Sequence, residues 1–357
     1  MTVYIVDLEA VESRYTGQWK THVPALVKSA GHEVCVISGP DDIPSATTPG
    51  AFLNFGGTNI YKASQVEKIA RMFTEGLIKQ GDHFVFTDAW HPGIINLKYM
   101  TELLNIKVTI HALWHAGSYD PQDFLGRIIG DAPWVRHAEK SFYHAIDHNY
   151  FATDFHRKMF AKNLLGHDDM SPSYEAHRLE LTGWPMEYMA ETLAPFKNLK
   201  KRDLILFPHR VAPEKQVEIF NDLAKAMPQY EWVVCQDKQL TKDEYHTLLG
   251  EAKMVFSANL QETLGISMYE GALVGAIPMV PDRLSYTEMY DPMFKYPSNW
   301  TESFESYAVH KNDLCKVITD HMLSHTASAT AIKQQAQWLT KHFFSATNLL
   351  NNITYDI

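Results

Sequence analysis

The segment ANLQETLGISMYEGALVGAIPMV, Ala258 to Val280, carries two glutamates, Glu262 and Glu270, and no other charged residue. Its apolar spacing predicts a helix over residues 266–276 that packs most of its surface against a protein interior. The run MVFSA before the segment predicts a strand, and IPMVP at its end predicts another. Strand, loop, helix and strand in this order are typical of a parallel α/β sheet.

Short apolar runs alternate with helical patterns along the rest of the chain, which indicates parallel sheets covered by helices on both faces. The polar, basic stretch PFKNLKKRD, which begins at Pro195, is typical of a linker. We therefore predict two Rossmann-like domains, over 1–194 and 195–335, followed by a C-terminal segment over 336–357. The runs expected to be strands are VYIVDL, HEVCVIS, AFLNFGG, HFVFTD, KVTIHALW, HNYFATD and LELTGWP, then LILFPHR, EWVVCQ, MVFSA and IPMVP.

Composition limits the classes of function. The 357 residues are 45% hydrophobic and carry a net charge of −10, so the chain has no general attraction to phosphate or anionic membranes. Three cysteines far apart fit a reducing compartment, and no apolar stretch approaches the roughly 20 residues that span a bilayer. The N-terminal residues read as a strand and not as a signal peptide, so we expect a cytoplasmic protein.

The position of Glu262 and Glu270 indicates a ligand site. Ligands of open parallel sheets bind at the carboxyl ends of the strands, where Gly265 allows close backbone approach and a helix N-terminus attracts anions. Carboxylates on either side could accept hydrogen bonds from sugar hydroxyls. The alternative is that Glu262 and Glu270 are only a helix-capping acid and a surface acid. The spacing of the two glutamates alone does not distinguish this alternative from a ligand site.

The pattern from Glu262 to Pro278, with Glu-Gly-Ala and Gly-x-x-Pro after the first glutamate, resembles the E-x7-E signature of retaining GT-B glycosyltransferases of the family-4 type. The resemblance implies two Rossmann-like domains that face a central cleft, and a C-terminal helix that packs back on the first domain. It also implies a nucleotide-sugar co-substrate, with no further cofactor and no metal. The donor would contact Glu262, Thr263, Leu264, Gly265, Ile266 and Glu270.

The segment FPHRVAPEK supports the same resemblance, because it is similar to the family's Gly-Arg-x4-Lys segment, whose cations hold the donor diphosphate. Arg210 and Lys215 would take these roles, and His209 replaces the usual glycine. The alternative for this segment alone is a solvated basic loop. Gly17 is what remains of the family's glycine-rich loop after the first strand, and we assign it to the donor site.

Resemblance in the first domain is looser. His115, at the end of the run KVTIHALW, is the candidate for the family's histidine near the anomeric carbon, and we count it with Glu262, Arg210 and Lys215 as catalytic. A metal site of His111, His115 and Asp120 is an alternative, although zinc sites prefer a denser ligand set. Acceptor contacts are expected from Asp88, His91, Tyr119 and Asp120, with a capping role as the alternative for Asp88.

The stretches FTDAWHPG and WHAGSYDP resemble glycosyltransferases of tailed bacteriophages, which modify hydroxymethylated pyrimidines in DNA. Six cations could contact DNA, and an ordinary mixed surface is the alternative; they are Arg127, Arg136, Lys140, Arg157, Lys158 and Lys162. We therefore predict a retaining glycosyltransferase that uses a UDP-sugar and hydroxymethylated DNA. The alternatives are a transferase for a surface polysaccharide or lipid-linked glycan, and a sugar-nucleotide binding module without catalysis.

Overall fold

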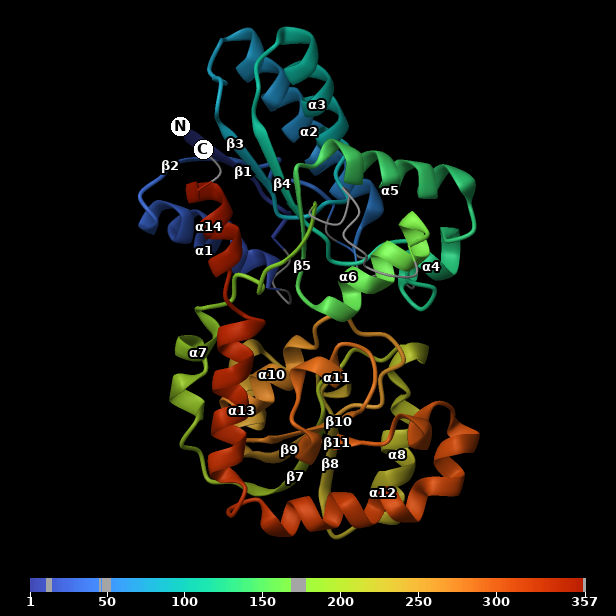
Figure 1. The fold of residues 1–357 in the computed structure, drawn as a ribbon. Helices are drawn as coiled ribbons and strands as arrows, with labels where there is room; N and C mark the ends of the chain where they lie inside the picture. The colour runs from blue at the N-terminus through green and yellow to red at the C-terminus, as the bar shows by residue number, and fades with distance from the viewer. Residues whose placement is uncertain (11–14, 45, 47–52, 168–177, 356–357) are drawn as a thin grey trace. The chain divides into compact units, whose positions relative to one another are not determined.

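The computed structural model describes residues 1–10, 15–44, 46, 53–167 and 178–355 (Figure 1). The chain forms two compact units. Unit 1 comprises Met1–Pro185 and Ala346–Ile357, and unit 2 comprises Met186–Ser345. Each unit has its own sheet, so each is described by itself.

Unit 1 contains a six-stranded parallel sheet in the order β2-β1-β3-β4-β5-β6. Its strands are β1 Thr2–Val6, β2 Glu33–Ile37, β3 His83–Phe86, β4 Thr109–Leu113, β5 His148–Phe151 and β6 Leu179–Leu181. Its helices are α1 Thr16–Ser29, α2 Phe55–Thr74, α3 Gly93–Leu104, α4 Phe124–Ile129, α5 Pro133–Ala145, α6 Asp154–Phe160 and α14 Thr347–Tyr355, with a π-turn, η1, at Ala161–Leu165.

Unit 2 contains a five-stranded parallel sheet in the order β11-β10-β9-β7-β8. Its strands are β7 Arg202–Phe207, β8 Glu231–Val234, β9 Ala252–Phe256, β10 Ile277–Pro281 and β11 Lys295–Tyr296. Its helices are α7 Met189–Thr192, α8 Val217–Ala226, α9 Lys242–Glu251, α10 Ile266–Leu273, α11 Tyr286–Met289, α12 Phe304–Ser324 and α13 Ala329–His342. Short 3-10 turns that matter below are η4 Pro213–Lys215, η5 Cys235–Lys238 and η6 Pro292–Phe294.

The central strands explain why the sequence forms these sheets. All the residues of β3 and of β10 are buried, as expected for parallel strands with helices on both faces. Gly271 in α10 permits close helix packing, because a Cβ there would lie 2.5 Å from a methyl carbon of Val255 in β9. The predicted fold class, α/β with two parallel sheets, is confirmed.

The strand order of unit 2 brings two loops together. The chain runs from β7 to β8 on one side and then returns to β9 on the other side of β7. The order therefore reverses between β7 and β9, and ligands of open α/β sheets bind outside the carboxyl ends of strands at such a point. The loop after β7 carries Arg210, and the loop after β9 carries Glu262.

The structure differs from the sequence-based prediction in three places. AFLNFGG was expected to be a strand, but its described part leads into α2, which begins at Phe55 behind the capping side chain of Asn54. Along the chain, unit 1 ends at Pro185 and unit 2 begins at Met186, before the linker predicted at Pro195. Instead of one helix over 336–357 there are two, with α13 in unit 2 and α14 in unit 1.

Helix α14 belongs to unit 1 (Figure 1). Polar side chains bond it to the strands of that unit. Asn348 Nδ2 donates to the carbonyl of Leu181 at 2.9 Å, and Asn352 Nδ2 donates to the hydroxyl of Tyr150 at 2.9 Å. The C-terminal helix therefore completes unit 1, although the first 185 residues that form its sheet are far away in sequence.

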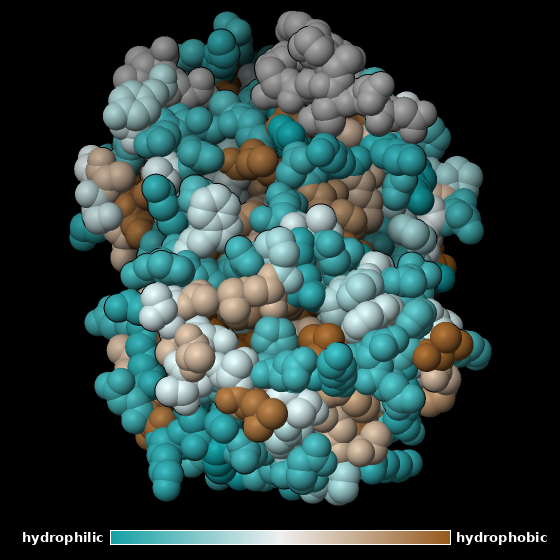
Figure 2. Space-filling view, turned by 60° about the horizontal axis from the view of Figure 1, so that its bottom comes forward, coloured by the Kyte–Doolittle hydropathy of each residue, from teal (hydrophilic) through white to brown (hydrophobic). Residues whose placement is uncertain are grey.

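Hydrophilic residues dominate the face shown in Figure 2, and the apolar residues there are scattered among them. Within the described ranges, no helix combines the length and the apolar character needed to cross a bilayer.

Candidate functional site

The loop after β9 needs a glycine at position 265. Gly265 has φ +78° and ψ 53°, a left-handed conformation that side chains with a Cβ adopt at a cost. A Cβ at this position would also lie 2.6 Å from the Cε1 atom of Tyr286. The chain then enters α10, whose first turn presents backbone N–H groups to the carboxyl edge of the sheet.

Glu262 lies in this loop beside a buried lysine. Its Oε2 is 3.3 Å from Lys215 Nζ, and its Oε1 accepts from the amides of Thr263 and Leu264 at 3.2 and 3.4 Å. Burial by itself raises the pKa of Glu262, but Lys215, His209 and the backbone amides of Leu264 and Gly265 lower it below its ordinary value. Glu262 is therefore an ionised hydrogen-bond acceptor at neutral pH.

Lys215 reaches Glu262 because the chain turns sharply after it. Its Nζ also donates to the carbonyl of Gln261 at 2.6 Å. The next residue, Gln216, has φ 53° and ψ 50°. Its side-chain Nε2 donates to the carbonyls of Ala258 and Thr301 at 2.6 and 2.7 Å. These bonds hold the left-handed residue in place and tie the loop after β7 to the loop after β9.

Arg210 is the more exposed cation of the two. It forms an ion pair with Glu214, whose side chain is 1% exposed, while the guanidinium side chain is 43% exposed. Glu214 also accepts the amide of Leu260 through its carbonyl at 2.8 Å. Arg210 is thus held at one end and open to solvent at the other, which suits a cation that binds an anionic ligand.

His209 stands where the Gly-Arg-x4-Lys pattern has a glycine. It is buried, and its Nδ1 lies 3.3 Å from Ser267 Oγ. Burial and Lys215 lower its pKa to a net value of about 3, although Glu262 and the hydrogen bond to the backbone of Phe256 act in the opposite direction. His209 is therefore neutral at physiological pH and adds no charge to Arg210 and Lys215.

Glu270, in the second turn of α10, has a different environment from Glu262. Its Oε2 accepts a hydrogen bond of 2.8 Å from the hydroxyl of Tyr245 in α9. Burial raises the pKa of Glu270 to about 7, although Tyr245 and Lys242 act in the opposite direction. The two glutamates of the motif therefore differ in charge state near neutrality.

In unit 1, both ring nitrogens of His115 are hydrogen bonded. Nε2 lies 2.6 Å from the carbonyl oxygen of Thr87, which can only accept, so Nε2 carries the proton. Nδ1 lies 2.6 Å from the hydroxyl of Tyr15, which donates to it when the ring is neutral. The rings of Trp19 and Trp184 lie 5.5 and 5.2 Å from the imidazole. The candidate catalytic histidine is enclosed by aromatic side chains.

Asp88 forms an ion pair with a buried lysine. Lys62 Nζ is 2.9 Å from Asp88 Oδ2 and donates to the carbonyl of Trp90 at 2.6 Å. Burial raises the pKa of Asp88, but Lys62, His115 and the amide of Trp90 lower it to a net value of about 2. A carboxylate with this pKa is a weak proton acceptor at neutral pH.

The other expected acceptor residues are buried and internally bonded. His91 Nε2 lies 2.9 Å from Gln65 Oε1, and its Nδ1 accepts from the amide of Gly93 at 2.9 Å. The Tyr119 hydroxyl is 2.7 Å from His156 Nε2. Asp120 Oδ1 accepts from the amide of Gln122 at 2.9 Å. These contacts support the fold of unit 1.

Gly17 is the second residue of α1 and lies in a helix, not in a loop. His111, from the alternative metal set, is fully buried between His83 Nδ1 at 2.9 Å and the Tyr150 hydroxyl at 3.0 Å. Within the parts of the chain that the structure describes, no three His, Cys, Asp or Glu side chains are arranged to hold a metal.

The cations expected at a DNA surface are largely engaged. Arg157 and Lys158 both pair with Asp154, and Arg136 Nε donates to the carbonyl of Gly130 at 2.8 Å. Lys140 and Lys162 are exposed.

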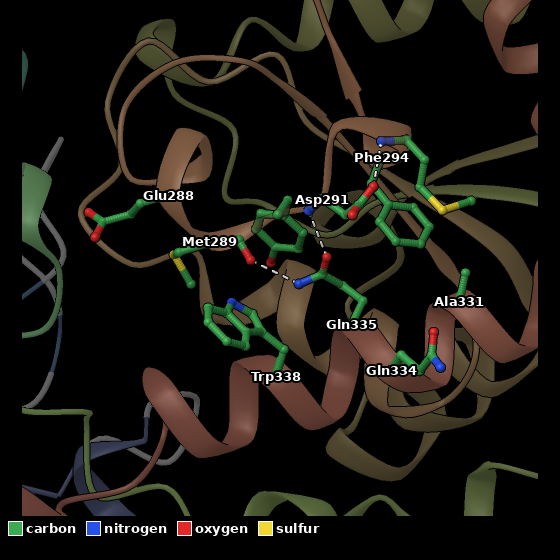
Figure 3. A pocket seen from close by; sticks show the side chains of 10 residues that line it. Glu288, Met289, Asp291, Phe294, Ala331, Gln334, Gln335 and Trp338 are labelled. Atoms are coloured by element: carbon green, nitrogen blue, oxygen red, sulfur yellow. Dashed lines mark hydrogen bonds between the residues drawn. The ribbon is translucent and has the colours of Figure 1, made fainter.

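A hollow of about 540 Å³ lies elsewhere in unit 2, between α11 with η6 and α13 (Figure 3). Gln335 lines this hollow. The side-chain amide of Gln335 donates to the carbonyl of Met289 and accepts from the backbone N–H of Asp291, both at 2.8 Å, and these bonds hold α13 to the segment after α11. Trp338 and Glu288 also line it, and its described lining contains no lysine or arginine. This hollow lacks the cations that a diphosphate requires.

No protein-family model and no curated protein matches the sequence. Several solved structures share the fold. Sucrose-phosphate synthase from Thermosynechococcus elongatus is 11% identical with a TM-score of 0.63, over 100% of this chain and 98% of that one. HepE from Anabaena, solved in complex with UDP and glucose, is 11% identical with a TM-score of 0.60, over 99% and 100%.

WaaG, a glycosyltransferase involved in lipopolysaccharide biosynthesis, is 13% identical with a TM-score of 0.58, over 99% of this chain and 100% of that one. At these identities the likeness concerns the fold. The chain therefore has the two-sheet α/β fold of GT-B glycosyltransferases along its whole length.

Proposed function

We propose that the protein is a retaining glycosyltransferase that uses a nucleotide-sugar donor, most simply a UDP-sugar. The observation that carries this proposal is the ion pair of Lys215 and Glu262 at the point where the strand order of unit 2 reverses. Gly265 and the first turn of α10 lie directly beside this pair. Two proteins with the same fold support it, since HepE was solved with UDP and glucose and WaaG is a glycosyltransferase.

The proposed chemistry assigns a task to each group. The sugar leaves a nucleoside diphosphate, on which negative charge grows in the transition state. Arg210, Lys215 and the amides of α10 stabilise that charge, and these contacts replace a metal ion. Ionised Glu262 accepts hydrogen bonds from the donor sugar, and Glu270 accepts them from the ribose. The acceptor hydroxyl oxygen bonds to the anomeric carbon from the face that the diphosphate leaves as the carbon–phosphate-oxygen bond breaks, and its proton passes to a phosphate oxygen of the leaving group. The anomeric configuration is then retained.

The proposed acceptor is a 5-hydroxymethylpyrimidine base in DNA. The stretches FTDAWHPG and WHAGSYDP, which resemble phage DNA-modifying enzymes, are the support for it. Lys140 and Lys162, which are exposed, would contact phosphates. DNA affinity should then fall steeply with salt, with a log–log slope of about −0.9 per phosphate contact.

The decisive experiment incubates the protein with a panel of UDP-sugars and DNA that contains hydroxymethylcytosine or hydroxymethyluracil, with mass detection after digestion to nucleosides. A parallel series offers lipid-linked and free saccharide acceptors. Sugar on a DNA base supports the proposal, while transfer to a saccharide or lipid alone moves the assignment to glycan synthesis. Donor binding with neither transfer nor hydrolysis would identify a binding module.

Stereochemistry and metal dependence test the mechanism separately. NMR of the first-formed product should show the anomeric configuration of the donor, and inversion would refute the retaining mechanism. Activity should persist after divalent ions are chelated, because Arg210, Lys215 and α10 supply the compensating charge.

A further inference from the structure

Glu270 is held by a residue from a different helix. Tyr245, the fourth residue of α9, directs its hydroxyl at Glu270 Oε2 over 2.8 Å. Among the described residues Oε2 is the hydrogen-bonded oxygen of this carboxylate, which leaves Oε1 available to a ligand. A hydrogen bond to one carboxylate oxygen fixes the rotation of the group, so Tyr245 determines where Oε1 points.

The charged and titratable groups around Glu270 are few. Lys242 and Tyr245 face it from α9, and Cys235 faces it from η5. No ion pair of Glu270 occurs among the residues that can be described, in contrast to the Lys215 contact of Glu262. Burial raises the pKa of the Cys235 thiol to about 12, and Glu270 contributes, so this group stays neutral. Tyr245 therefore donates the principal hydrogen bond that stabilises the charged form of Glu270.

We propose that Tyr245 is a positioning residue whose hydroxyl orients Glu270 to accept hydrogen bonds from the ribose of the nucleotide donor. The inference rests on the proposed function and adds a residue outside the E-x7-E motif. Because burial raises the pKa of Glu270, we also expect nucleotide binding to depend on pH.

The direction of that sensitivity follows from the chemistry. Burial raises the pKa of Glu270 to about 7. Below this pH Glu270 is protonated and loses acceptor capacity toward ribose hydroxyls, so binding weakens by at most about tenfold per pH unit. Because Tyr245 favours the charged form, its removal raises the pKa of Glu270 further. The midpoint of the binding curve then moves up by about one pH unit, which corresponds to one hydrogen bond to a charged group.

The experiment measures the Kd of UDP by calorimetry from pH 5.5 to 9 for the natural protein and for Tyr245→Phe. The terminal phosphate of UDP also titrates, with a pKa of about 6, so Glu270→Gln supplies the baseline. Tyr307→Phe is the matched control, because the Tyr307 hydroxyl donates to a carboxylate, that of Asp222, at 2.8 Å in the same unit. Tyr245→Phe should shift the midpoint, and Tyr307→Phe should leave it in place.

A Tyr245→Phe variant that loses affinity equally at every pH, or that keeps the natural curve, overturns the positioning role. The carbon-13 NMR titration of the Glu270 carboxyl, without nucleotide, gives a second readout. Its midpoint should rise in Tyr245→Phe, and an unchanged midpoint also overturns the role. If the natural protein binds no UDP while the NMR midpoint still rises, the proposed nucleotide function fails and the ribose contact fails with it, although Tyr245 still orients Glu270.

Discussion

The carboxyl edges of the two sheets hold similar polar residues under different constraints. In unit 2, Lys215 and Glu262 lie 3.3 Å apart in loops, beside the partly exposed Arg210 and the first turn of α10. In unit 1, Asp88 is paired with buried Lys62, and His91 is bonded on both nitrogens inside the fold. A polar residue after a parallel strand is thus a candidate for ligand binding only when its neighbours leave part of its hydrogen-bonding capacity unused.

Removal of a cation in unit 2 should give the largest effect on activity. Arg210→Ala and Lys215→Ala would remove the proposed contacts to the leaving diphosphate, which strengthen as its charge grows. Such contacts are worth roughly 3–4 kcal/mol, or a loss of about 100- to 1,000-fold in kcat. Lys253→Ala is the matched control, because Lys253 forms an ion pair with Asp203 in the same unit. Near-normal transfer by either site variant would show that unit 2 does not hold the diphosphate there.

Removal of the lysine in unit 1 should instead affect stability. Lys62→Met leaves the partly buried Asp88 carboxylate without its cation, which costs about 3 kcal/mol of the free energy of unfolding. Urea unfolding at pH 7 measures the loss, and the double variant Lys62→Met/Asp88→Asn should recover much of it. The pair contributes fully above the unfolded-state pKa near 4, and its contribution disappears as the pH falls through the folded pKa of about 2. A Lys62→Met protein of natural stability would refute the contrast between the two edges.

Gly265→Ala should give an intermediate loss of stability, because it combines backbone strain with a clash against Tyr286. Gly81→Ala separates the two causes, since Gly81 has φ +84° and a Cβ added there would meet no atom within 4 Å. We expect about 1 kcal/mol for Gly81→Ala and about 2 kcal/mol for Gly265→Ala in thermal unfolding. Equal losses would mean that the loop relaxes around the added methyl group.

The smallest effect that we expect is a difference in UDP binding between variants of Glu270 and Glu262. Glu270→Ala should weaken the binding of bare UDP by about tenfold, because it would remove the proposed hydrogen bonds to the ribose. Glu262→Ala should leave UDP binding nearly intact and impair sugar transfer. Calorimetry with UDP, together with transfer assays, separates the two, and equal losses of UDP affinity would contradict the division of labour.

The sequence by itself determined the two parallel sheets and the residues of the loop after β9. Apolar runs of strand length between helical patterns define a parallel α/β architecture locally, and Glu262, Gly265 and Glu270 are close in sequence. Their placement at a strand end could therefore be predicted. AFLNFGG was misjudged because its apolar residues suit a strand, while Asn54 caps a helix that begins one residue later.

Tertiary structure decided which polar residues remain available. Nothing in the local sequence of α9 indicates that Tyr245 bonds to Glu270, since the two are 25 positions apart in sequence. The same holds for the pairing of Tyr15 with His115, 100 positions apart, and for the contact of Lys62 with Asp88. Folding brings together the neighbours that bury a polar group and form hydrogen bonds with it. Burial and these bonds determine the pKa of the group and how much hydrogen-bonding capacity it keeps for a ligand. The sequence therefore shows which residue types a site contains. The charge states and the accessibility of these side chains depend on how the whole unit packs.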